Sequence, residues 1–162
     1  NPSFEEDDGD GVPDGWHVGW LDLSDRAGRA RWYRDKTHWD ALVKTGQRSA
    51  LLLWAPEMGL EWRQTWRHAI RCSGGETYCG KAWAKARGAS GAAWFGLQAY
   101  DTNYQPLNLV RSEAVTDGDA WQSLSVVIHV PQEAAWLRVL LHGEAGDGAV
   151  WFDDVEVVRV ED

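Results

Sequence analysis

Short segments in which apolar and polar residues alternate recur along this chain of 162 residues, and turns rich in Gly, Pro or Asp separate them. Alternation with a period of two puts one set of side chains on each face of a β-strand. No stretch shows convincing helical periodicity. Strands recurring about every ten residues predict an all-β fold, in which two antiparallel sheets pack as a β-sandwich. The predicted strands cover residues 1–6, 16–23, 47–55, 62–71, 77–86, 92–100, 121–130, 135–142 and 149–158, with a weaker strand near Leu107.

The length and charge of the chain limit what it can be. A chain of 162 residues forms one domain and can bury about 70% of its unfolded surface. A formal net charge of −9 argues against binding to nucleic acid or to anionic membranes. No apolar run approaches the roughly 20 residues of a membrane span. No segment of the sequence has the pattern of a signal peptide and the first residue is Asn1, so we expect residues 1–162 to be a single module excised from a larger protein.

Tryptophan is the outstanding feature of the composition. The chain contains 12 tryptophans, far more than a core of this size needs. Tryptophan is large, stiff and amphipathic, and exposed rings of this kind stack on ligands. Many of the 12 will still belong to the core, but their number suggests a surface that stacks on a ligand.

Two adjacent carboxylates, Asp153 and Asp154, lie in the middle of the apolar last strand. Burying them costs several kcal/mol unless a partner compensates their charge. Residues 1–6 have the same mixture of one aromatic residue and acids. A calcium ion shared between the first and last strands would compensate both, since calcium prefers oxygen ligands. The alternative is an edge strand whose acids face water, and spacing alone does not decide between the two.

Two segments depart from simple alternation. Residues 24–40 are polar, Arg-rich and irregular, which is long for a loop and indicates either a functional loop or a folded excursion. Residues 62–71 alternate strictly, but neither face is cleanly apolar. We therefore expect one face of this strand to line a groove. Alternation leaves open which of Trp62 and Trp66 faces that groove.

The chain has two cysteines, Cys72 and Cys79, which bracket a turn over residues 73–78. If that turn joins a hairpin, the two cysteines lie opposite one another, and an exported protein would form a disulfide there. If the two strands belong to different sheets, the bond can still form at the edge of the sandwich. Two free buried thiols are the alternative.

Six short motifs follow one another along nearly the whole chain. They are residues 1–5 (NPSFE), 14–16 (DGW), 46–51 (GQRSAL), 75–78 (GETY) running on to 82–85 (AWAK), 121–124 (WQSL) and 152–157 (FDDVEV). In this order they resemble the carbohydrate-binding modules of the group that includes families 4, 9, 16 and 22. The resemblance implies a jelly-roll sandwich of the galactose-binding-domain type, attached to a secreted polysaccharide-degrading enzyme.

The resemblance also implies roles for individual residues. A structural calcium would be held by Glu5 and Asp153, with backbone carbonyls near Ser3 and Arg48 completing its shell. A tryptophan that stacks on sugar corresponds to Trp62 or Trp66, and a tyrosine at the end of a strand corresponds to Tyr100. A polar position, acidic in some relatives, corresponds to His142. Where relatives have a polar residue shortly after the first tryptophan, this chain has Trp20.

Sugar rings dock their C–H faces on aromatic rings, while amides, carboxylates, Arg and His bond their hydroxyl groups. We therefore looked for strand faces that are aromatic and polar rather than aliphatic. Alternation predicts such faces on strands 92–100 and 135–142 and on one side of strand 62–71. The predicted carbohydrate-binding residues are Trp20, Trp62, Trp66, Trp94, Gln98, Tyr100, Arg138 and His142.

These observations predict a non-catalytic carbohydrate-binding module. We expect it to bind a plant or microbial polysaccharide of the β-glucan or xylan type, as a secreted monomer that targets a covalently linked glycan-active enzyme. The chain lacks Gly-x-Ser-x-Gly, His-Glu-x-x-His, Cys-x-x-Cys and phosphate-loop motifs. Two alternatives remain open. One is a jelly-roll polysaccharide lyase or glycoside hydrolase domain, and the other is a structural spacer that binds nothing.

Overall fold

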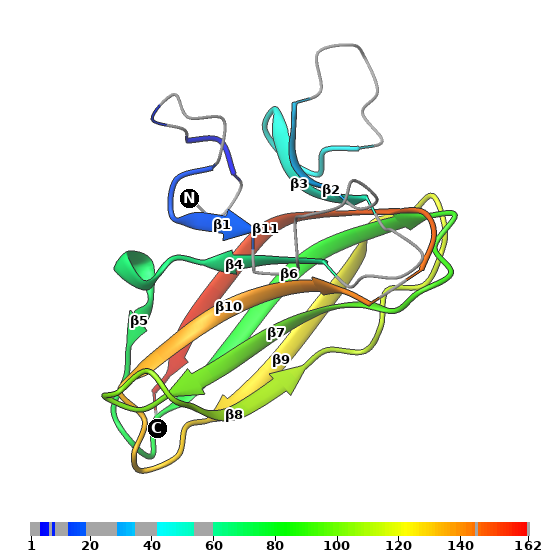
Figure 1. Cartoon of the computed structure of the whole chain (residues 1–162). Helices are drawn as coiled ribbons and strands as arrows, with labels where there is room; N and C mark the ends of the chain where they lie inside the picture. Colours follow the sequence, from blue (N-terminus) through cyan, green and yellow to red (C-terminus); the bar gives the residue numbers. More distant parts are fainter. Residues whose placement is uncertain are drawn as a thin grey trace.

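The computed structural model describes residues 4–6, 8, 13–18, 29–34, 42–53, 60–144 and 146–161. These residues form two antiparallel sheets that face one another, with the longest strands running diagonally across the molecule (Figure 1). Sheet A contains, in spatial order, β1 (Trp16–Val18), β4 (Leu60–Gln64), β10 (Trp136–Gly143), β7 (Ala93–Tyr100) and β8 (Pro106–Arg111), and the short β5 (Ile70–Arg71) also pairs with β10. Sheet B contains β2 (Arg29–Arg34), β3 (Arg48–Leu53), β11 (Ala149–Val160), β6 (Thr77–Arg87) and β9 (Gln122–His129).

The core lies between the two sheets, as alternation predicts. On β7, Phe95 and Leu97 are fully buried, and they pack in one cluster with Phe152 of β11. Gly80 of β6 makes room for this packing, since a Cβ there would lie 2.7 Å from the Phe95 ring. The predicted all-β fold of two antiparallel sheets is confirmed.

The strand predicted over residues 62–71 is wrong, because the chain turns in its middle. β4 ends at Gln64, a 3-10 helix η1 (Trp66–His68) follows, and β5 begins at Ile70. The Thr65 N–H still donates to the Gly15 carbonyl at 2.7 Å, next to the Trp16–Gln64 pair of β1 and β4. The His68 N–H then donates to the Thr65 carbonyl at 3.1 Å, and this 3-10 turn ends the alternation. Helix η1 is three residues long, and none of the described residues form a helix long and apolar enough to cross a lipid bilayer.

The irregular segment 24–40 contains a strand, β2, which pairs with β3 along six residues of sheet B. This part of the segment is a folded excursion, one of the two predicted alternatives. The rest of the segment lies outside the described residues.

Cys72 and Cys79 do not flank a hairpin. The strand before the turn, β5, belongs to sheet A, and the strand after it, β6, belongs to sheet B. Both cysteines are free thiols, so the expected disulfide is not formed in this structure. Burial, with a smaller contribution from Glu76, raises the pKa of the Cys72 thiol to about 11, so it is uncharged and unreactive at neutral pH.

Candidate functional site

The face of sheet A that points away from sheet B, called the outer face below, brings together most of the predicted ligand-binding residues. The register of the strands arranges its side chains in rows. The central row crosses five strands in the order Arg111, Gly96, Leu140, Arg63 and His17. A cluster of residues lies on each side of this row.

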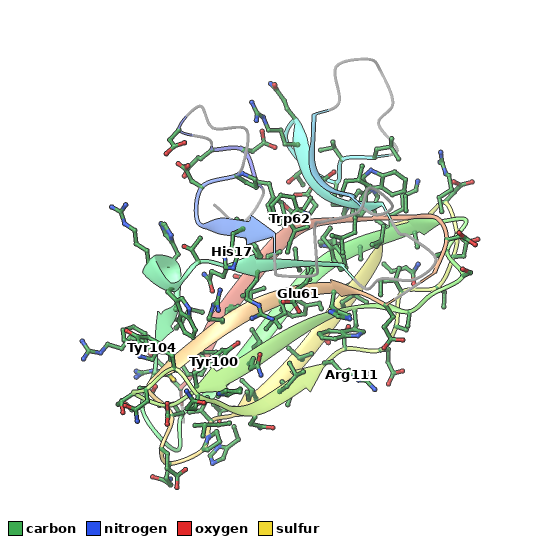
Figure 2. The ribbon with its side chains drawn as sticks, viewed as in Figure 1. His17, Glu61, Trp62, Tyr100, Tyr104 and Arg111 are labelled. Atoms are coloured by element: carbon green, nitrogen blue, oxygen red, sulfur yellow. The ribbon has the colours of Figure 1, made fainter. Side chains whose placement is uncertain are left out.

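The first cluster is an aromatic patch made of Trp66, Tyr100, Tyr104 and Trp136. The centroid of the Trp66 ring lies 4.8 Å from that of Tyr100 and 4.7 Å from that of Tyr104. Tyr104 also stacks with Trp136 at a centroid distance of 6.2 Å. Tyr100 and Tyr104 lie near the same end of sheet A, whereas His17 and Glu61 lie further along it (Figure 2).

The four rings differ in accessibility. Trp66 is 39% exposed and Tyr104 is 53% exposed, whereas Tyr100 is only 4% exposed. The Tyr100 hydroxyl donates to Gln98 Oε1 at 2.7 Å, which fixes both side chains. Trp136 is half-buried. Trp66 and Tyr104 are therefore the most accessible rings of the patch, and Tyr100 supports Trp66 from the side.

Arg138 of β10 backs the aromatic patch. Its side chain is only 2% exposed, and the carbon between its guanidinium nitrogens lies 4.1 Å from the centroid of the Trp66 ring. The Nε atom donates to the Gln64 carbonyl at 2.7 Å, and Nη2 donates to the same oxygen. Burial lowers the pKa of Arg138, and no carboxylate among the described residues lies within ion-pairing distance. The guanidinium thus covers one face of Trp66.

The second cluster, called the charged cluster below, is made of Glu61, Arg63, Trp94 and His142. The His142 ring stacks on Trp94 at a centroid distance of 4.4 Å, and its Nδ1 atom lies 3.3 Å from Glu61 Oε2. Arg63 Nε donates to Glu61 Oε1 at 2.6 Å. Trp94 is only 7% exposed, and its Nε1–H finds no hydrogen-bond partner in the part of the chain that the structure describes. The His142 ring, paired with Glu61, therefore covers one face of Trp94.

The structure places most, but not all, of the predicted carbohydrate-binding residues on the outer face. Trp66, Gln98, Tyr100, Arg138 and His142 lie together on the outer face, and Trp94 lies there beneath His142. Trp62 is the member of the Trp62/Trp66 pair that belongs to the core: it is fully buried, and its Nε1 donates to the Leu51 carbonyl at 3.1 Å. Trp62 is therefore no candidate for ligand contact. Trp20 lies outside the described residues.

Sequence reasoning missed Tyr104, Glu61 and His17. Tyr104 follows a predicted turn, where alternation assigns no face. Glu61 directly precedes Trp62, so a correct inward assignment of Trp62 would have placed Glu61 on the outer face. His17 lies opposite Arg63, and its pKa is lowered by burial and by the charges of Arg138 and Arg63.

Tyr104 has an unusual backbone. Its φ angle is +63°, a left-handed conformation that costs a residue other than glycine about 1 kcal/mol or more. The Asp101 side chain holds the turn, because its Oδ1 accepts from the Asn103 and Gln105 N–H groups at 2.8 Å each. The Tyr104 N–H itself donates to the Asp101 carbonyl at 3.1 Å.

The predicted metal ligands hold one segment of chain, residues 44–48. Asp153 Oδ2 accepts from the Lys44 and Thr45 N–H groups at 2.9 and 3.2 Å. Glu5 Oε1 accepts from the Gln47 and Arg48 N–H groups at 2.8 and 2.9 Å. Ser3 lies outside the described residues.

Asp153 is fully buried, and β11 lies between β3 and β6, so the alternative of an edge strand with water-facing acids is wrong for Asp153. Burial raises its pKa to about 7 despite three backbone N–H donors, which marks a carboxylate whose charge is poorly compensated. No group of three or more His, Cys, Asp or Glu that could hold a metal occurs among the described residues. Glu5 and Asp153 supply carboxylate oxygens, the kind of ligand that calcium prefers.

A cavity of about 270 Å³ lies elsewhere, at the edge of the sandwich. Its lining includes Trp16, His68, Val139 and Val157. Val139 lies on the face of sheet A that points toward sheet B, so this cavity does not open on the outer face. None of the predicted carbohydrate-binding residues lines it.

No protein-family model and no curated protein matches this sequence. Several solved structures match its fold. A family 61 carbohydrate-binding module in complex with β-1,4-galactotriose has a TM-score of 0.62 and 17% identity, with 99% of this chain and 96% of that chain covered. The CBM22-2 xylan-binding domain of Xyn10C from Paenibacillus barcinonensis has a TM-score of 0.63 and 15% identity, with 98% of each chain covered.

A third match is the enzymatically active domain of tailspike protein 4 from bacteriophage CBA120. Its TM-score is 0.67 with 13% identity, and the match covers 91% of this chain but only 20% of the tailspike chain. The whole-length matches show that the chain has the jelly-roll fold of carbohydrate-binding modules, as the resemblance of its motifs implied.

Proposed function

We propose that this protein is a non-catalytic carbohydrate-binding module that binds a β-linked polysaccharide on the outer face of sheet A. The observation that carries the proposal is Trp66, a partly exposed indole whose inner face rests on the buried Arg138 guanidinium and whose edge contacts Tyr100. A ring fixed in this way offers a flat apolar surface to the C–H face of a pyranose. Two modules of the same fold, covered over nearly their whole length, are a galactotriose complex and a xylan-binding domain.

Polar groups next to Trp66 can bond sugar hydroxyls. Gln98 is half-buried, and its amide NH₂ can donate while its oxygen accepts from Tyr100. His142 lies on the far side of the central row and Arg63 lies within that row, and both pair with Glu61. This mixture of one apolar platform and several neutralised polar groups favours a neutral polymer of the β-glucan or xylan type.

The proposed biological setting is extracellular. We propose that the module is secreted as part of a longer protein and directs a linked glycan-active enzyme to its substrate. One solved chain with this fold joins a family 22 module to a family 10 xylanase module, which gives a precedent for such a link.

Affinity electrophoresis tests the proposal directly. The protein is run through native gels that contain β-glucan, xylan, β-1,4-galactan, mannan or alginate, with Trp66→Ala as the matched control. We expect retardation of the wild type in at least one neutral polymer and loss of retardation in the variant. A protein that migrates freely in every gel would be a spacer, and release of reducing sugars or unsaturated products would instead indicate an enzyme.

We also propose a structural calcium ion, held by Glu5, Asp153 and backbone carbonyls near Ser3 and Arg48. The support is the fully buried Asp153 carboxylate, which together with Glu5 holds residues 44–48. Calcium that binds only the folded state raises the melting temperature by mass action, so a chelator should lower it and added calcium should restore it. Asp153→Asn should abolish this response. Identical melting curves with and without chelator, together with an ion analysis that finds no calcium, would contradict the proposal.

A further inference from the structure

Tyr104 carries an aromatic ring where the backbone favours glycine or asparagine. Its φ angle of +63° places it in the left-handed region, which a bulky residue adopts only at a cost in stability. Burial of the ring does not offset this cost, because 53% of the side chain remains exposed. For the backbone conformation alone, Asn or Gly would suit this turn better, so the reason for a tyrosine here lies in what its ring contacts.

The turn presents the Tyr104 ring in a fixed position. The Asp101 carboxylate accepts hydrogen bonds from the residues on both sides of Tyr104, and the Tyr104 ring contacts both Trp66 and Trp136. The planes of Tyr104 and Trp66 meet at 61°, with centroids 4.7 Å apart. Two exposed rings at this angle form a corner, in which one ring can serve as a platform and the other as a side wall.

This corner continues the proposed binding surface. Trp66 contacts Tyr100 on one side and Tyr104 on the other, so the aromatic patch extends from the face of the sheet to the β7–β8 turn. Leu107 and Leu109 of the neighbouring edge strand β8 are also exposed. The apolar surface therefore extends past the residues needed to stack one sugar on Trp66.

We propose that the Tyr104 ring is an additional pyranose-binding position that takes the sugar next along the chain from the one stacked on Trp66. This inference rests on the proposed function. It predicts that affinity keeps rising with oligosaccharide length until the added position is filled.

The test is calorimetry with oligosaccharides of increasing length, from two to six units, taken from the xylan, cellulose and β-1,4-galactan series. Three proteins are compared: wild type, Tyr104→Phe, which keeps the ring, and Tyr104→Asn, which loses the ring but tolerates the left-handed backbone. For the longest ligand we expect the Asn variant to bind about five- to tenfold more weakly than wild type. For the shortest ligand that binds, the two should agree within about twofold, and the Phe variant should match wild type throughout.

The melting temperature of Tyr104→Asn should equal or exceed that of wild type, which shows that the lost affinity is not lost folding. Tyr104→Gly serves the same purpose should the Asn variant fold poorly. Equal affinity of wild type and ring-less variants for the longest ligand would overturn the inference, as would the same loss at every length. If the proposed function is wrong, the result is different, since wild type itself would then bind no oligosaccharide or polysaccharide.

Discussion

The aromatic patch and the charged cluster lie on the same face of the same sheet, yet their tryptophans have opposite surroundings. Trp66 rests on the buried Arg138 guanidinium, and its outer side is partly exposed. Trp94 lies beneath the His142 ring, which Glu61 holds in place, and is almost fully buried. The side on which the cationic or polar partner lies decides whether a surface tryptophan is available to a ligand.

The two regions have different roles. We infer that the aromatic patch binds the ligand, so substitutions in it should weaken affinity and change stability little. The charged cluster, by contrast, stabilises the sheet and contributes little to affinity. Substitutions in the core beneath both regions should lower the free energy of unfolding the most. Substitutions in the core, in the charged cluster and in the aromatic patch should therefore differ in their effects on stability and affinity.

The largest effect is expected for Trp62→Ala, in the core beneath the outer face. The change removes a fully buried indole and its hydrogen bond to the Leu51 carbonyl. It should lower the free energy of unfolding by about 3–5 kcal/mol. Denaturant titration with Trp66→Ala as the control measures this, and equal stability of the two variants would show that the inward and outward assignments are wrong.

Trp94→Ala should act mainly on stability. The change removes a nearly buried ring and leaves His142 without its stacking partner, so we expect a loss of about 2–3 kcal/mol in unfolding free energy. Affinity for the polymer identified in the gels should stay within about threefold of wild type. A large loss of affinity at unchanged stability would mean that His142 moves aside and that Trp94 binds sugar.

Trp66→Ala should show the reverse behaviour. Loss of its exposed stacking surface should cost about 1–3 kcal/mol in binding, roughly a ten- to hundredfold weaker affinity, with less than about 1 kcal/mol lost in stability. Calorimetry for affinity and thermal melting for stability give both numbers. The distinction between the two regions fails if Trp66→Ala and Trp94→Ala behave alike.

Tyr100→Phe should have a smaller effect. It keeps the nearly buried ring but removes the hydroxyl that donates to Gln98. We expect a loss of about 0.5–1.5 kcal/mol in unfolding free energy and a change in affinity of about twofold, caused by a less restricted Gln98. Tyr100→Ala, by contrast, should lower both stability and affinity, because this ring is buried as well as adjacent to Trp66.

The smallest expected effect concerns His17 and pH. Its folded pKa lies below the ordinary value of 6.5, so below pH 6.5 the unfolded chain binds more protons at this position than the folded chain does. Stability should therefore fall slightly as pH drops below 6.5, until the lowered folded pKa is reached. The His17→Gln variant should lack this part of the pH dependence, and superimposable stability profiles of the two proteins would contradict the prediction.

The strands could be predicted wherever one face is uniformly apolar. Alternation placed Phe95 and Leu97 in the core, and the motif resemblance placed Tyr100 in the candidate site. The prediction for residues 62–71 fails because the 3-10 turn at Trp66–His68 takes the chain out of the strand without interrupting the alternation of residue types. Tyr104 was missed for a related reason, since the direction of a side chain in a turn depends on its φ angle rather than on a repeating pattern.

Arg138 has a consequence for the kinetics of binding. Two hydrogen bonds from the guanidinium to the Gln64 carbonyl anchor it, and the guanidinium restricts the rotamer of the Trp66 ring before any ligand arrives. The ring therefore loses little conformational entropy when a sugar stacks on it, which lowers the cost of association. Ligands of related structure should associate at similar rates, and selection among them should be expressed in how long each one stays bound.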